Sequence, residues 1–309
     1  MRIAIIDLGT NTFNLLIAEL VNNTYNILVE TKYPAKLGKG GINNKTIIPE
    51  AFERGITALE IHKKACDDYG VEKIICIATS AIRNAKNGDE FVSQVKLLLG
   101  LDIRIIDGEK EAQLIYDGVK QVVPFEIENS IILDIGGGSN EFIIANKDGI
   151  LWKHSFELGM ARMLDRFPPS DPITKDEIKT VTDYYRENLT LLFDALKKYP
   201  SSRLVGSSGS FDTIVAMLAA IYHPALDMSK LTTYPIDLEK YAVLHQKYIT
   251  SLLAERAKMD RMDSHRIEMI VLASIFINFI VEECGITEMV QCSFSLKEGA
   301  IHQIINKQL

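Results

Sequence analysis

The sequence contains few cysteines, and their spacing fits neither a metal site nor a disulfide framework. The four among 309 residues are Cys66, Cys76, Cys284 and Cys292. No two have Cys-x-x-Cys spacing and their density is low, so reduced thiols in a cytoplasmic protein are predicted. The six histidines are scattered and form no His-Glu-x-x-His pair, which argues against a zinc site.

The chain also lacks a basic surplus. Its 34 lysines and arginines are outnumbered by 41 acidic residues, which gives a formal net charge of −7. Proteins that bind nucleic acids carry basic surfaces, so this composition argues against a general nucleic-acid partner. A polyanionic ligand would need a local basic lining.

Long apolar runs are missing as well. The most apolar stretch, residues 269–281, is short for a membrane span and contains Ser274 and Asn278. It predicts a buried helix, although an apolar helix would also suit a homodimer interface. Asp7 interrupts any signal-peptide core at the N-terminus. A cytoplasmic protein without a membrane partner is predicted, with a homodimer as the expected assembly.

What the chain does contain is typical of a globular protein. Hydrophobic residues make up 47% of it and charged residues 24%. Its length suits two domains of ordinary size.

The most informative stretch is residues 131–142. An apolar β-branched run leads to Asp134, three glycines and Ser139 follow, and Glu141 opens a second apolar run, which predicts strand, tight turn and strand. Glycine amides in such a turn can converge on an anion, and the two carboxylates are hard donors suited to Mg²⁺. The alternative is an ordinary hairpin turn with Asp134 bonded to its own backbone.

A second copy of this pattern lies near the N-terminus. Residues 3–13 form an apolar run, Asp7, Gly9, and then Thr10, Asn11 and Thr12. Two such turns suggest an internal duplication, with Asp7 either active in the opposing loop or satisfied within its own turn.

The predicted elements repeat in the same order in both halves. Each half reads as three strands, then helix, strand, helix, strand and helix, which predicts two α/β lobes with a cleft between them. The helices expected in the second half include residues 174–199, 237–257 and 264–283.

Six segments together resemble the exopolyphosphatase/guanosine pentaphosphate phosphohydrolase (Ppx/GppA) family. They are residues 7–13, 79–85, 108–116, 134–141, 206–210 and 296–299. The resemblance implies two duplicated actin-like, ribonuclease H-like lobes. The expected division is residues 1–124 with the C-terminal helix 295–309, and residues 125–294. Longer members append a helical domain, so the chain resembles the short form.

The resemblance also implies a reaction. The expected activity is Mg²⁺-dependent hydrolysis of the terminal phosphate of inorganic polyphosphate, or of the 5′-terminal phosphate of guanosine pentaphosphate. Glu111 matches the family's catalytic glutamate, and Asp134 and Glu141 match its pair for metal binding and water orientation. The alternative for Glu111 is a first-turn carboxylate stabilised by the helix dipole.

The expected phosphate-binding residues come from four segments. They are Thr10, Asn11, Thr12, Arg83, Gly136, Gly137, Gly138, Ser139, Gly206, Ser207, Ser208, Gly209 and Ser210. Arg83 could instead form a surface salt bridge, and Ser207 or Ser208 could merely cap a helix. Basic residues that could guide distal phosphates are Lys36, Lys39, Arg162, Arg166, Lys197 and Lys198.

Four positions depart from the family's usual pattern, and two other functions remain open. Lys110 replaces a frequent acid, Asn140 a common Thr, Glu268 a usual Asp and Ala273 a common Gly. The rival functions are an ATP-dependent small-molecule kinase of the same superfamily and a non-catalytic sensor of guanosine tetraphosphate or pentaphosphate.

Overall fold

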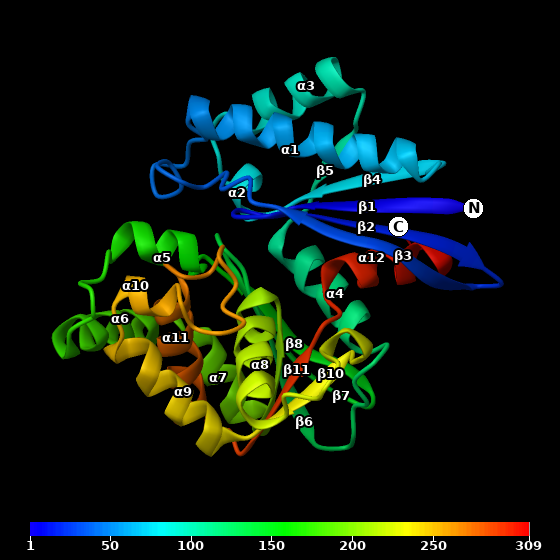
Figure 1. The fold of residues 1–309 in the computed structure, drawn as a ribbon. Helices are drawn as coiled ribbons and strands as arrows, with labels where there is room; N and C mark the ends of the chain where they lie inside the picture. Colours follow the sequence, from blue (N-terminus) through cyan, green and yellow to red (C-terminus); the bar gives the residue numbers. More distant parts are fainter. Residues whose placement is uncertain (309) are drawn as a thin grey trace.

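The computed structural model describes residues 1–308, which form two mixed β-sheets (Figure 1). The first sheet has the order β3-β2-β1-β4-β5. Its strands are β1 (Arg2–Leu8), β2 (Phe13–Val21), β3 (Thr24–Tyr33), β4 (Lys73–Ala78) and β5 (Ile103–Ile105). With α1 (Pro49–Asp68), α2 (Ser80–Arg83) and α3 (Gly88–Leu99) it makes the first lobe.

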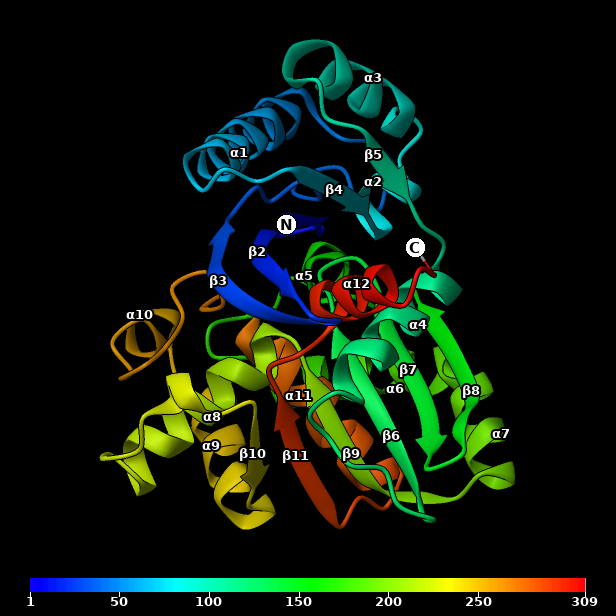
Figure 2. The same ribbon diagram turned by 90° about the vertical axis from the view of Figure 1, so that its right-hand side faces the viewer.

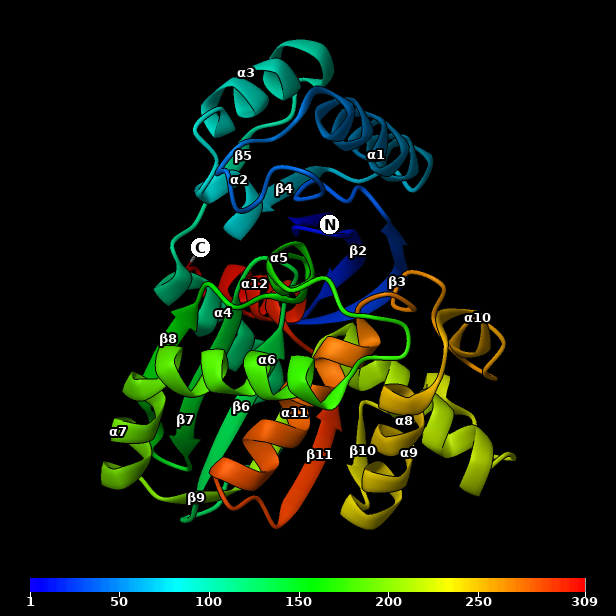
Figure 3. The same cartoon turned by 90° about the vertical axis from the view of Figure 1, so that its left-hand side faces the viewer.

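The second sheet has the order β10-β11-β9-β6-β7-β8. Its strands are β6 (Asn129–Ile135), β7 (Asn140–Asn146), β8 (Gly149–Phe156), β9 (Ser201–Ser207), β10 (Thr233–Ile236) and β11 (Glu288–Cys292). The helices of this second lobe are α5 (Met160–Arg166), α6 (Lys175–Asn188), α7 (Thr190–Lys198), α8 (Gly209–Tyr222), α9 (Leu238–Thr250), α10 (Leu253–Arg256) and α11 (Ile270–Glu283), with a 3₁₀ turn at Met228–Lys230. Figure 3 shows α6, α7 and α11 along one face of the sheet.

The two sheets repeat one topology. In each, the first three strands form antiparallel hairpins, the fourth runs parallel to the first, and a further parallel strand follows. β10 is an additional antiparallel edge strand on β11. This arrangement confirms the predicted fold of two duplicated ribonuclease H-like lobes.

The central strands explain why both turns lie at the cleft. β1 and β6 each pair with strands on both sides, and their apolar residues from Ile3 to Ile6 and from Ile131 to Leu133 are fully buried. Continuous apolar runs are typical of strands covered on both faces. Each run ends at the Asp that opens its turn, so the turns lie at corresponding ends of the two sheets.

Two helices lie between the sheets, as Figure 2 shows. α4 (Gly108–Val119) and α12 (Leu296–Ile305) share one core with both sheets, including Ile5, Ile115, Ile132 and Ile301. α12 also contacts β1 of the first sheet. Residue 309 of the predicted C-terminal helix lies outside the described residues. The division of the chain at residue 124 stays a proposal.

Close packing of α12 against α4 requires glycine. A Cβ at Gly299 would lie 1.8 Å from the Leu114 carbonyl oxygen. We expect Gly299→Ala to lower the free energy of unfolding by about 3 kcal/mol, because backbone atoms must move apart. Gly285→Ala is the control: that site is open but has a φ of +63°, so the substitution should cost only about 1 kcal/mol. Equal shifts in the thermal midpoints of the two variants would contradict close packing as the cause.

Three predicted helices are shorter than their periodicity suggested. The helix expected over 174–199 breaks at Leu189, whose side chain is fully buried while its backbone leaves the helix. The helix expected over 237–257 breaks at Ser251, which is extended. The helix expected over 264–283 begins only at Ile270. The apolar spacing continues through the breaks at Leu189 and Ser251, so it does not reveal them.

The apolar stretch 269–281 belongs to the core. Most of α11 is buried, with Leu272, Phe276 and Ile280 fully so, which confirms the predicted buried helix. This stretch therefore has no exposed apolar face for a homodimer. In residues 1–308, every helix is too short or too polar to cross a membrane.

Candidate active site

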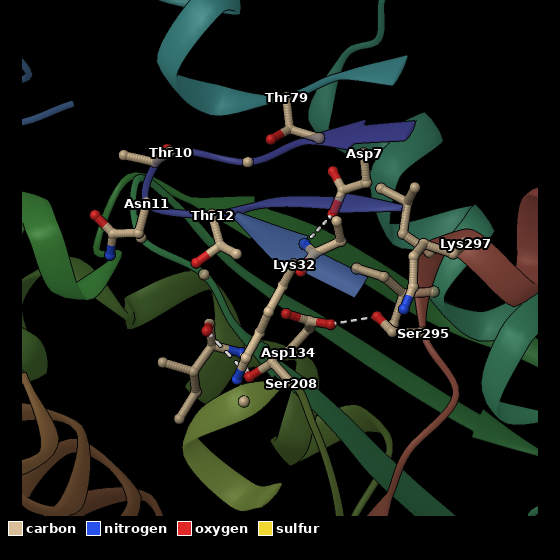
Figure 4. Close-up of a pocket in the computed structure, with 18 of the residues that line it drawn as sticks. Asp7, Thr10, Asn11, Thr12, Lys32, Thr79, Asp134, Ser208, Ser295 and Lys297 are labelled. Carbon is tan, nitrogen blue, oxygen red and sulfur yellow. Dashed lines mark hydrogen bonds between the residues drawn. The ribbon is translucent and has the colours of Figure 1, made fainter. Parts of the chain in front are cut away.

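A cleft of about 430 Å³ lies between the two lobes, at the ends of β1 and β6 (Figure 4). It brings together most of the site residues expected from the sequence. Those that line it are Thr10, Asn11, Thr12, Glu111, Asp134, Gly136, Gly137, Gly138, Ser139, Glu141, Ser208 and Gly209. Arg83, Gly206, Ser207 and Ser210 do not line it. Arg83, Ser207 and Ser210 each contact a lining residue, whereas Gly206 pairs with Leu133.

The two predicted phosphate turns face each other closely. A Cβ at Gly138 would lie 2.5 Å from both Thr10 Oγ1 and Ser80 Oγ, and a Cβ at Gly137 would lie 2.8 Å from Asn11 Nδ2. Side chains at these positions would hold the lobes apart. The glycines therefore serve the close approach of the two turns, which an isolated hairpin would not require.

α5 orients the glycine turn. The amides of Met160, Ala161 and Gly159 donate to the carbonyls of Gly136, Gly137 and Gly138 respectively. Since the N–H of a trans peptide points opposite to its C=O, the amides of residues 137–139 point away from α5. The Gly136 amide is already bonded to the Ser139 carbonyl at 3.0 Å. The amides that could donate hydrogen bonds to an anion are thus those of Gly137, Gly138 and Ser139.

Arg162 supports this turn from within the protein. Its side chain is buried, Nε donates to the Gly138 carbonyl at 3.0 Å, and a second nitrogen pairs with Glu157. The expectation that Arg162 guides distal phosphates is therefore wrong. None of the other basic residues proposed for that task lines the cleft: Lys36, Lys39, Arg166, Lys197 and Lys198.

Glu111 projects from the first turn of α4. The α4 N-cap is Asp107, which accepts the Lys110 amide at 2.7 Å, so Glu111 is not the capping residue. Its side chain is buried and Oε2 accepts Arg83 Nη1 at 2.7 Å. Burial raises the Glu111 pKa to about 7, although Arg83 opposes that shift.

The salt bridge between Arg83 and Glu111 lies inside the protein rather than at its surface, and Arg83 does not line the cleft. Besides Glu111, it donates to the Ile106 carbonyl at 3.1 Å. Both bonds come from Nη1, which ties the Glu111 carboxylate to the backbone at the end of β5.

Asp134 and Glu141 lie directly opposite one another on β6 and β7. Cross-strand partners project on the same face of a sheet, so both carboxylates reach the cleft. Asp134 accepts Ser295 Oγ at 2.5 Å and Ser207 Oγ at 3.2 Å, rather than its own backbone. Burial raises the pKa of Asp134, against the hydrogen bonds from the two serines. Burial, with Glu111 and Asp134 nearby, raises the pKa of Glu141 well above its usual value.

Asp7 occupies the matching position in the first lobe. Its Oδ2 accepts Asn14 Nδ2 from the neighbouring strand at 2.9 Å, and burial raises its pKa to about 6. The first lobe thus contributes a carboxylate to the same cleft as Asp134 and Glu141.

The α8 N-terminus forms part of the cleft wall. Ser208 precedes the helix, but its hydroxyl exchanges hydrogen bonds with the backbone of Ile135 and does not cap α8. Ser207 supports Asp134, Ser210 accepts Arg266 Nη1 at 3.2 Å, and Gly206 lies against Phe211. The capping alternative for Ser207 and Ser208 is wrong.

The cleft lining is acidic, contrary to the basic lining expected for a polyanion. The carboxylates that line it are Asp7, Glu30, Glu111, Asp134, Glu141, Asp212 and Asp263. The lysines and arginines among the described lining residues are Lys32, Arg266 and Lys297. An excess of carboxylates repels phosphate unless a cation or protons compensate.

The donor set fits Mg²⁺ in one way only. Within residues 1–308, no three His, Cys, Asp or Glu side chains are grouped so as to hold a metal ion. Mg²⁺ commonly keeps several waters and binds one or two carboxylates together with substrate phosphates. Asp134 and Glu141, paired across β6 and β7, match that mode and not a cage made by protein alone.

Several lining residues were missed by sequence reasoning. They are Lys32, Asp212, Asp263, His265, Arg266, Ser295 and Lys297. Lys297 lies inside the recognised segment 296–299, which was a usable signal. Ser295 directly precedes that segment, and Asp263, His265 and Arg266 share one short segment just before Glu268, whereas Lys32 and Asp212 stand alone without a local motif.

The chain is similar to known proteins over nearly its whole length. The sequence model of the Ppx/GppA phosphatase family matches residues 16–308. A Haemophilus influenzae protein with exopolyphosphatase as its provisional name is 27% identical over 303 residues, covering 98% of this chain and 91% of that protein.

Two solved structures are similar over nearly their whole length. A Cytophaga hutchinsonii exopolyphosphatase superposes with a TM-score of 0.96 at 36% identity, covering 99% of this chain and 98% of that one. An Aquifex aeolicus member of the Ppx/GppA family superposes with a TM-score of 0.81 at 25% identity, covering 100% of this chain and 98% of that one.

Proposed function

This chain belongs to the Ppx/GppA phosphatase family, and we propose that it is an exopolyphosphatase that hydrolyses the terminal phosphate of inorganic polyphosphate. One observation carries the proposal. Two phosphate turns from different lobes face each other across a cleft that also contains a buried, arginine-held Glu111. The two turns suit a phosphate, and the carboxylate suits a water nucleophile.

The terminal phosphate would lie between the turns. The amides of Gly137, Gly138 and Ser139 point away from α5 and would bind its oxygens, with Thr10 and Asn11 on the opposite side. Phosphoryl transfer depends chiefly on positioning and on stabilising charge at the transferred oxygens. Donors fixed in advance by backbone hydrogen bonds supply both.

Glu111 would orient the attacking water and accept its proton. A pKa near 7 suits a general base at neutral pH, and Arg83 fixes the carboxylate through Oε2. Arg83 is therefore proposed as a positioning residue for Glu111 rather than as a phosphate ligand.

Asp134 and Glu141 are the residues that would hold Mg²⁺. When bound, Mg²⁺ would neutralise phosphate charge and join the substrate to the acidic wall. Ser207 and Ser295 keep Asp134 in place, and Ser155 donates to Glu141 at 2.6 Å. These hydroxyls fix the orientation of both carboxylates.

We expect removal of divalent metal to abolish phosphate release from polyphosphate. The acidic lining would then repel the substrate, so KM should rise beyond the measurable range as Mg²⁺ is chelated. Restoring Mg²⁺ should restore the rate, whereas a matched amount of Na⁺ should not. Full activity in the presence of chelator would contradict this role for the lining.

Guanosine pentaphosphate is the second candidate substrate. The cleft lining also includes the Asp212 carboxylate and the Ser293 hydroxyl. A carboxylate there would suit the N–H groups of a guanine base.

The proposal is tested by measuring phosphate release from long-chain polyphosphate, guanosine pentaphosphate and ATP in parallel. We expect Mg²⁺-dependent release from polyphosphate. We also expect release from guanosine pentaphosphate if the part of the cleft lined by Asp212 and Ser293 binds guanosine. Transfer of phosphate from ATP to an alcohol would instead support the kinase. Tight binding of guanosine tetraphosphate or pentaphosphate without turnover of any substrate would support the sensor.

A further inference from the structure

The three cationic side chains identified in the cleft differ in how firmly they are held. Lys297 is only 19% exposed, and its Nζ lies 2.9 Å from Glu30 Oε1 and 3.6 Å from Glu298 Oε1. Arg266 donates to Ser210 and packs on Gly209, where a Cβ would lie 2.3 Å from Nη2. Lys32 is 53% exposed and is held by a single ion pair, with Asp263.

The Lys32–Asp263 pair spans the cleft. Lys32 belongs to β3 of the first lobe, whereas Asp263 lies in the segment before α11 of the second lobe. Both residues line the cleft, and Figure 4 shows the Lys32 side chain extending from its strand into the space beside Thr12 and Ser208. The amine is thus close to the route that a phosphate chain would take out of the site.

Strand register places Lys32 relative to the turns. Asp7 pairs with Asn14 across β1 and β2, and Asn14 pairs with Lys32 across β2 and β3. The three residues form one row across the sheet on its cleft side. Since neighbouring strands lie about 4.8 Å apart, the Lys32 backbone is about 10 Å from that of Asp7. Its long side chain can therefore reach the space next to the terminal-phosphate site.

The two partners differ in freedom. Asp263 is fixed within its own segment because Oδ1 accepts the His265 amide at 2.9 Å. The Lys32 amine sits on a flexible four-carbon stem. The Asp263 side chain is only 18% exposed, but Lys32 is open to solvent. Ion pairs that solvent reaches contribute little net free energy, so a multiply charged anion can compete for the amine.

We propose that Lys32 binds an inner phosphate of the substrate and that the Asp263 carboxylate occupies its place until substrate arrives. The inference rests on the proposed function, because it assumes a phosphate chain whose end lies between the turns. Substrate phosphate displaces the Asp263 carboxylate from the Lys32 amine, so Asp263 competes with substrate for that amine. The site therefore favours chains of several phosphates over orthophosphate.

The alternative is that the Lys32–Asp263 pair only holds the two lobes together. The two explanations predict opposite effects of Asp263→Asn on substrate affinity. If the pair only held the lobes together, losing either partner would weaken binding equally. If Asp263 competes with phosphate, Asp263→Asn should tighten binding while Lys32→Met weakens it.

The test is calorimetric binding of tripolyphosphate in Mg²⁺ buffer, made in the Glu111→Gln background so that the ligand persists. We expect Lys32→Met to raise the tripolyphosphate Kd about five- to tenfold (about 1.0–1.4 kcal/mol) and Asp263→Asn to lower it about threefold (about 0.6 kcal/mol). The double variant should match Lys32→Met. Lys197→Met, which removes an exposed lysine outside the cleft, should change nothing.

Orthophosphate is the control ligand for tripolyphosphate, because it would occupy only the terminal-phosphate site. Its Kd should stay the same in all these variants. Because the readout is binding, it remains informative even if the protein does not hydrolyse polyphosphate. An increase in the tripolyphosphate Kd for Asp263→Asn, or an equal Lys32→Met effect on orthophosphate, would overturn the proposal.

Discussion

Glu111→Gln is expected to lower kcat for phosphate release from polyphosphate by about a thousandfold, within the range typical of losing a general base. Glutamine keeps the shape of the side chain, and its carbonyl oxygen can still accept the Arg83 hydrogen bond now made at 2.7 Å. It cannot take a proton from water. The effect should therefore appear in kcat, with KM and the Kd for orthophosphate changed little.

Glu109→Gln is the matched control for this substitution. Glu109 lies in the same first turn of α4, but its side chain is 56% exposed and it does not line the cleft. Its loss should leave kcat unchanged. If Glu111→Gln and Glu109→Gln behave alike, Glu111 has only the helix-dipole role that a first-turn carboxylate can have.

Gly138→Ala should lower kcat/KM by about a hundredfold or more, which is the scale of losing one preorganised donor. The added methyl would lie 2.5 Å from Thr10 Oγ1 and Ser80 Oγ. Relief requires either rotation of the glycine turn, which moves its amides, or separation of the lobes, which moves Thr10. Both changes disrupt the terminal-phosphate site.

The control for Gly138→Ala separates activity from stability. Gly100 ends α3 with a φ of +68° and nothing near its Cβ position, so Gly100→Ala should cost about 1 kcal/mol of stability without affecting turnover. Thermal midpoints measured beside steady-state rates give the comparison. Normal kcat/KM in Gly138→Ala would show that close approach of the turns is not needed for activity.

The fold was largely predictable because its main signals are local and repeated. Apolar runs that end in Asp and glycine mark β1 and β6, and the same order of elements follows each. The helix breaks at Leu189 and Ser251 were not predictable, because the spacing of apolar residues continues through them. Those bends depend on how distant elements pack.

The candidate site was predictable where a turn or a family motif carries it. The two turns and Glu111 lie within contiguous segments, and the structure brings them to one cleft. The pairing of Arg83 with Glu111 could not be predicted from the sequence. It depends on the pairing of β4 with β5, which brings α2 next to the start of α4. The charge of the lining was also hidden, since Lys32, Asp212, Asp263 and Lys297 come from four distant segments.

The most direct test of the central claim is turnover of polyphosphate with Mg²⁺ in ¹⁸O-labelled water. In-line attack by water on the terminal phosphorus places one solvent oxygen in each phosphate released, so mass spectrometry should find singly labelled orthophosphate and progressively shorter chains. Released phosphate without label would show attack at the next phosphorus or transfer through another acceptor. Either that result or the absence of release would contradict the account.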